Sequence, residues 1–164
     1  MQFDWIQFLS ATMVMFAVID IVGSIPLILD IKSKAGDVQP LRATLVAFGI
    51  MIAFLFIGER IIGLLGIDVN SFAVAGSFVL FILALEMILG IELFKHEEQS
   101  RDVASIVPIA FPIVAGAGSM TSILSLRAEY EQINIAAAIF INLVLVYIVL
   151  RATGKIGRFL GDGG

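Results

Sequence analysis

The chain has 164 residues, of which 60% are hydrophobic and 15% charged, and its formal net charge is -4. Soluble domains are nearer one quarter charged, so this composition indicates that the solvent is lipid. The small net charge and the lack of a basic patch argue against a nucleic-acid partner. Cysteine is absent and His96 is the one histidine, so neither a thiolate site nor another metal or haem site is expected.

Five segments are apolar over about the 20 residues that a bilayer span requires. They cover residues 5–29, 42–65, 71–94, 103–126 and 133–150. Pro40 stands just before the second segment, where proline suits a helix start. The first segment is too long, and too poor in preceding basic residues, to be a secretory signal. We therefore expect an all-α, polytopic membrane protein with a single transmembrane domain over residues 1–164.

Clusters of glycine, serine and proline interrupt the first and fourth segments. One cluster covers residues 20–26, and the other covers residues 108–121. A proline inside a lipid-buried helix removes a backbone hydrogen bond, and the freed carbonyl meets no water. Such breaks persist where the backbone lines a polar cavity, and a matched pair of them points to the substrate site of a small transporter.

An internal echo at an offset of 95 residues suggests two related halves. Gly23-Ser24 falls on Gly118-Ser119, and Arg60 falls on Lys155. We expect two three-span repeats, over about residues 1–95 and 96–164, and an odd number of crossings inverts the second in the membrane. The partner of the third span would begin beyond residue 164, so five of an expected six spans are present.

Basic residues predict the orientation of the chain, because cytoplasmic joints are enriched in them. Arg60 and Arg127 fall on one side of the membrane. The other eight fall on the opposite side: Lys32, Lys34, Arg42, Lys95, Arg101, Arg151, Lys155 and Arg158. That side should be cytoplasmic, with the N-terminus outside.

The sequence motifs at the two breaks and at the start of the third segment resemble those of the MarC family of small integral membrane proteins, and the resemblance covers essentially all of residues 5–164. The residues that carry the resemblance lie at 20–26, at 66–76, and at 107–112 with 115–121. The family often has Asn-Pro or Asp-Pro where this chain has Asp20-Ile21, and Gly-Pro-Gly where it has Gly116-Ala117-Gly118, so softer breaks are expected. The family includes neutral amino acid transporters, and the resemblance implies such transport in the inner membrane of a prokaryote.

The candidate residues for substrate or ion binding gather at the two breaks and at polar positions of two further spans. They are Asp20, Gly23, Ser24, Pro26, Glu86, Pro108, Pro112, Gly116, Gly118, Ser119, Thr121 and Asn142.

Several of these residues also have a purely structural interpretation. Asp20 either caps the half-helix that starts near Gly23 or carries a proton or the substrate amine. Glu86 is either a coupling carboxyl or a packing contact. Asn142 is expected to tie helices together, with substrate contact as the second interpretation. Hydroxyls near the breaks can bond back to their own helix, and the glycines can simply allow close packing.

The expected function is secondary transport of small neutral amino acids, coupled to protons or to the membrane potential. The helix start after Gly116 suits a carboxylate, and Asp20 suits an amine. The chain has no Walker-type loop, so ATP is not the direct energy source, and neither enzymatic activity nor a cofactor is expected. The alternatives are an exporter of another small metabolite or drug, a passive channel, or an intramembrane assembly factor without a transport role.

Overall fold

The computed structural model describes residues 3–35, 38–64 and 105–160, together with single positions between 66 and 89. The described part is all-helical, as predicted, and contains six helices. They are α1 (Trp5–Ile19), α2 (Ile25–Ala35), α3 (Pro40–Leu64), the π-helix η1 (Ser105–Val114), α6 (Ala117–Glu129) and α7 (Gln132–Leu160). The predicted third span and Glu86 fall largely outside these residues.

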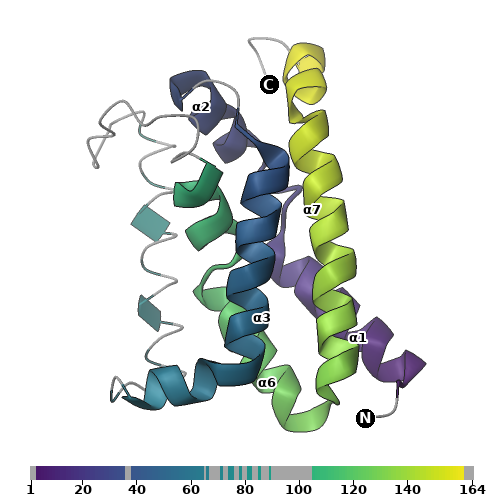
Figure 1. Cartoon of the computed structure of the whole chain (residues 1–164). Coiled ribbons are helices and arrows are strands. Elements are labelled where there is room, and N and C mark those ends of the chain that lie inside the picture. Colours follow the sequence, from purple (N-terminus) through teal and green to yellow (C-terminus); the bar gives the residue numbers. More distant parts are fainter. Residues whose placement is uncertain are drawn as a thin grey trace.

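Two long helices, α3 and α7, form the centre of the bundle. Over Pro40–Gly58 and Gln132–Gly154 they are long and apolar enough to cross a membrane. They pack against each other, α1 packs on α7, and α6 packs on both α1 and α3. In Figure 1, α2 lies at the upper end of the bundle and α6 at the lower end.

The buried face of α3 is a single stripe of side chains spaced four residues apart. Ala43, Ala47, Met51 and Leu55 are almost completely buried, because residues at this spacing share one helix face. The opposite face is also apolar, since Leu41 and Leu45 are both 59% exposed. A helix that is apolar on both faces is typical of one surrounded partly by protein and partly by lipid.

The helices extend past the predicted spans. α7 continues ten residues beyond the expected end at Leu150, and α2 continues to Ala35 instead of ending at residue 29. Hydropathy marks where lipid contact ends, whereas main-chain hydrogen bonding can continue into the polar interface. The sequence-based ends were therefore too early.

A polar clamp fastens the start of α1 to the start of α7. Asp4 caps α1 by accepting from the backbone N–H groups of Ile6 and Gln7. The fully buried Asn134 accepts from the Asp4 N–H at 3.0 Å and donates to the Gln7 side chain at 2.9 Å. Three aromatic rings surround this end with centroids 5.2–5.9 Å apart: Phe3, Trp5 and Phe8. Aromatic clusters of this kind are common at membrane interfaces.

Candidate functional site

The first break lies between Ile19, the last residue of α1, and Ile25, the first residue of α2. Asp20 adopts a left-handed conformation, with φ 41° and ψ 52°, and its N–H donates to the Phe16 carbonyl. Asp20 Oδ1 then accepts from the Gly23 N–H at 3.1 Å, and the Asp20 carbonyl accepts from the Ser24 N–H at 3.0 Å. Asp20 therefore ends one helix and holds the turn that leads into the next.

Gly23 leaves room for this carboxylate. A Cβ atom at Gly23 would collide with the Asp20 carboxylate oxygens. A larger residue would displace the carboxylate from the N–H group that it caps. The Asp20–Gly23 pair is thus one unit, and the Asp20 carboxylate caps the turn before α2, whereas the half-helix itself starts two residues later, at Ile25.

The second break lies between η1 and α6, at Ala115 and Gly116. The Ala115 N–H donates to the Ala110 carbonyl at 2.9 Å, which continues the five-residue spacing of the π-helix. Gly116 has an extended backbone, and a Cβ atom there would collide with the Pro112 carbonyl oxygen. Close approach of two backbone segments therefore requires glycine at this position.

The hydroxyl groups at the breaks all donate to nearby main-chain carbonyls. Ser24 donates to Asp20 at 2.9 Å and Thr121 donates to Ala117 at 2.6 Å. Buried Ser119 lies 3.0 Å from the carbonyl oxygens of both Val114 and Gly116. The local bonding considered for these residues is thus confirmed, and their oxygen lone pairs remain available as acceptors.

The two breaks differ in whether a carboxylate accepts from a backbone N–H group of the break. The offset of 95 residues pairs Asp20 with Ala115 and Gly23 with Gly118. The carboxylate that accepts from the Gly23 N–H therefore has no counterpart in the sequence at the second break. Consistent with this, no side chain in the described part of the chain caps the first turn of α6.

The two breaks lie next to each other in the bundle. A Cβ atom built on Gly118 would lie 3.3 Å from Val18 Cγ1, and Val18 is two residues before Asp20. In Figure 1, α1 and α6 occupy the same half of the bundle, with α2 at the other end. The end of α1 and the start of α6 are therefore adjacent.

Asn142 lies away from the breaks. Its Nδ2 donates to the Thr12 carbonyl at 3.1 Å and to the Ala138 carbonyl at 2.9 Å. Thr12 precedes Asp20 by eight residues, which is more than two helical turns. Asn142 therefore ties α7 to α1, the structural interpretation favoured from the sequence. The remaining proline candidates lie inside helices: Pro26 in the first turn of α2, and Pro108 and Pro112 in η1.

Three polar contacts involve residues that sequence reasoning did not include among the site candidates. One of these residues is Asn134, described above. The other two are basic residues of α2 and α6, the half-helices that follow the two breaks. Arg127 Nη1 donates to the Leu55 and Phe56 carbonyls at 3.0 and 3.2 Å, and Lys32 Nζ donates to the Leu150 carbonyl at 3.4 Å. Their acceptors are main-chain groups of distant helices, so the sequence contains no local signal for these contacts.

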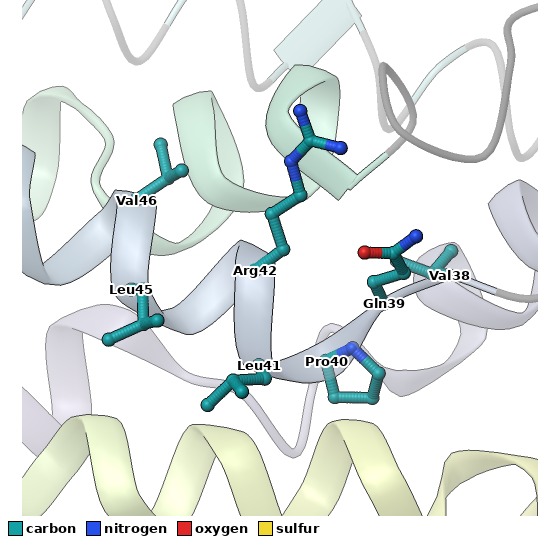
Figure 2. Close-up of a pocket in the computed structure, with 7 residues that line it drawn as sticks. All are labelled: Val38, Gln39, Pro40, Leu41, Arg42, Leu45 and Val46. Carbon is teal, nitrogen blue, oxygen red and sulfur yellow. The ribbon is translucent and has the colours of Figure 1, made fainter.

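Two hollows on the surface lie apart from the break residues. One, of about 390 Å³, lies between α1 and α7 and is lined by Thr12, Met13, Phe16, Ala17, Ile141, Asn142 and Leu145. The other, of about 650 Å³, lies at the start of α3 and is lined by Val38, Gln39, Pro40, Leu41, Arg42, Leu45 and Val46 (Figure 2). Both are lined largely by apolar side chains, as expected for surfaces that meet lipid.

Comparison with known proteins identifies the family. Residues 5–164 match the MarC family of integral membrane proteins. A protein of Buchnera aphidicola named "UPF0056 membrane protein" is 24% identical, over 96% of this chain and 84% of its own length. Proteins of the same name from Aquifex aeolicus and Archaeoglobus fulgidus are each 28% identical, over 97% and 96% of this chain and 81% and 80% of their own lengths. No solved structure matches the chain.

The chain therefore belongs to the MarC family, as its motifs indicated, and is a multi-pass integral membrane protein.

Proposed function

We propose that this MarC-family protein is a secondary transporter of small neutral amino acids, coupled to protons or to the membrane potential. The substrate would bind between the two helix breaks, with its carboxylate at the start of α6 and its amine at Asp20. The proposal rests on the chemistry of the breaks, supported by the relation between the two halves of the chain.

The helix boundaries support two repeats, over about residues 1–95 and 96–164. Moving the bounds of α3 by 95 residues gives 135–159, and α7 covers Gln132–Leu160. The same shift moves α2 to 120–130, and α6 covers Ala117–Glu129. Arg127, which shortly precedes α7, bonds near the end of α3, so the two long helices are antiparallel. Equivalent helices that run in opposite directions are expected of inverted repeats.

The single observation that carries the proposal is the uncapped start of α6. The N-cap residue of α6 is Gly116, and its first turn, which includes Gly118, has no side-chain cap in the described region, whereas at the first break the Asp20 carboxylate accepts from the Gly23 N–H in the turn before α2. A helix start with free N–H groups and partial positive charge favours an anion. A substrate carboxylate would occupy at the second break the place that Asp20 occupies at the first.

The position of Asp20 favours a zwitterionic substrate. Asp20 is exposed, and Oδ1 of its carboxylate accepts from the Gly23 N–H. The approach of Val18 to Gly118 places the end of α1, which Asp20 follows, beside the uncapped start of α6. One carboxylate beside one anion site suits a molecule with an ammonium and a carboxylate a few ångströms apart. An alternating-access movement of the two repeats around this site would carry it across the membrane.

Uptake into proteoliposomes tests the proposal. The purified six-span protein should accumulate labelled alanine or another small neutral amino acid when a pH gradient or a potential is imposed. Unlabelled alanine should compete, whereas alaninamide and N-acetylalanine, which each lack one of the two charges, should not. Absence of accumulation across the neutral amino acids would refute the proposed substrate class. Equal competition by alaninamide would refute the carboxylate position.

A further inference from the structure

Two basic side chains, at opposite ends of the bundle, cross from a half-helix to a long helix. Arg127, in the last turn of α6, donates to carbonyl oxygens of α3 at 3.0 and 3.2 Å. Lys32, in α2, donates to the Leu150 carbonyl oxygen of α7 at 3.4 Å. Figure 1 shows α2 and α6 at the two ends of the bundle. The two ends are far apart, because the part of α7 from Asn134 to Leu150 alone rises roughly 24 Å.

The two contacts are equivalent under the internal repeat. Lys32 and Arg127 are 95 residues apart, and the acceptors Leu55 and Leu150 are also 95 residues apart. This offset comes from the Gly-Ser motifs and not from these contacts. Donor and acceptor therefore correspond together, and each half of the chain fastens its half-helix to the long helix of the other half.

Each contact controls the far end of a half-helix whose near end is a break. α2 starts at the first break and carries Lys32 in its eighth position, and α6 starts at the second break and carries Arg127 in its eleventh position. A helix of this length moves as a rigid rod, so release of its far end is transmitted to the break. A movement there would open a path from that end of the bundle to the proposed binding site.

The chemistry of the contacts allows release. A helical carbonyl has a second lone pair, so a cation can bind it without disrupting the helix. Lysine and arginine also have long stems that can place the charge in interfacial water when the contact opens. Apolar packing has no such alternative partner. The contacts of Arg127 with the α3 carbonyls are shorter than the contact of Lys32 with the Leu150 carbonyl, and a shorter hydrogen bond is the stronger one.

We propose that Lys32 and Arg127 are positioning residues that act as two locks, each closing one end of the transport path. The inference rests on the proposed transport function and adds its gating elements. In the state described both locks are closed, and the contact from Lys32 to the Leu150 carbonyl is longer than the contacts of Arg127. Alternation between the two locks would give alternating access to the breaks.

Side-specific thiol labelling tests the locks, since the chain contains no cysteine. A reporter, Ser24→Cys, would be placed at the first break and exposed to a small impermeant thiol reagent on one side of the membrane at a time. Ser33→Cys and Glu131→Cys, both at exposed positions near opposite ends, would mark the two sides independently. The labelling rate from each side would be measured in the reporter background with each lock variant.

Arg127→Gln should raise the labelling rate from the Arg127 side by about tenfold, the effect expected from losing a charge-assisted hydrogen bond. Lys32→Gln should raise the rate from the opposite side by a smaller factor. Arg127→Lys should largely restore the parent rate. Lys32→Arg should lower labelling from the Lys32 side, because a guanidinium can make the double contact seen at Arg127.

The locks would be refuted if either Gln variant left labelling unchanged, or raised it from both sides or from the wrong side. If the Gln variants fail to fold, the Lys32→Arg measurement decides, because an unchanged or increased rate contradicts the inference. Labelling requires no substrate, so a failure of amino-acid uptake does not affect the result. Normal uptake combined with side-independent labelling would refute the locks and leave the transport proposal intact.

Discussion

Asp20 combines a structural contact with the chemistry expected of a coupling group. Its carboxylate caps the turn after α1 through the Gly23 N–H, and the side chain remains exposed at the break. An ionisable group deep in a membrane segment is costly unless it meets water or a partner. An asparagine could form the same cap, because it accepts a hydrogen bond and tolerates the left-handed backbone. The cap alone therefore does not require the negative charge of Asp20.

Asp20→Asn should separate these two contributions. We expect the melting temperature and expression to stay close to those of the parent, because the bond from the Gly23 N–H is retained. Substrate accumulation should be lost or become independent of pH, because the titratable charge is gone. The measurements are thermal unfolding in detergent and uptake into proteoliposomes with and without an imposed pH gradient.

Asp4→Asn is the matched control, because Asp4 also caps a helix with its carboxylate but lies at the far end of α1. It should leave both the uptake rate and its pH dependence unchanged. If Asp20→Asn behaves like Asp4→Asn in transport, Asp20 is a cap alone. Glu86, which lies outside the described residues, would then be the leading coupling candidate.

At the scale of helices, the sequence predicted the elements that depend on local chemistry. The α3 and α7 spans follow from long apolar runs, and the breaks follow from glycine, serine and proline inside such runs. The π-helical form of η1 and the far end of α7 could not be predicted this way. They depend on how the backbone packs and on hydrogen bonding that continues where lipid contact has ended, and hydropathy reports neither.

The candidate site could also be predicted only where it depends on local chemistry and not on packing between distant segments. The Asp20–Gly23 cap and the tight turn at Gly116 are local, so the motif indicated them. Asn134 begins an apolar run and shows no special pattern, although its side chain joins α7 to α1. Its partners lie more than 120 residues away in sequence, and only the packed bundle brings them together.

Asn134→Ala should be more destabilising than Asn142→Ala, although each removes one buried amide. Loss of the Asn134 side chain leaves the Asp4 N–H without its acceptor. Loss of the Asn142 side chain affects only carbonyl groups of helical residues, which retain their main-chain donors. We expect a loss of about 1–2 kcal/mol for Asn134→Ala and less than about 1 kcal/mol for Asn142→Ala. Unfolding of the two variants in a denaturing detergent mixture gives the comparison. Equal losses would contradict the importance assigned to the clamp.

Across the whole molecule, hydrogen bonds between helices place the helix ends that carry charged residues at two opposite faces of the bundle. The bond from Lys32 to Leu150 places the end of α2 beside the later part of α7, next to Arg151. The clamp between Asn134 and Asp4 places the chain start at the opposite face, with the end of α6 that carries Arg127. This grouping agrees with the split of basic residues in the sequence. The face that is richer in lysine and arginine is the one expected in the cytoplasm.

The orientation of the bundle is a prediction that thiol labelling in whole cells can test. Ser33→Cys, on the basic face, should react with an impermeant reagent only after the cells are permeabilised. Glu131→Cys, at the opposite face and beside the clamp, should react in intact cells. Both positions are exposed in the bundle, so a failure to label reports the membrane barrier and not burial. Labelling of position 33 but not of position 131 in intact cells would reverse the topology. The Arg127 lock would then face the cytoplasm, and transport would have to be described with the two ends of the path exchanged.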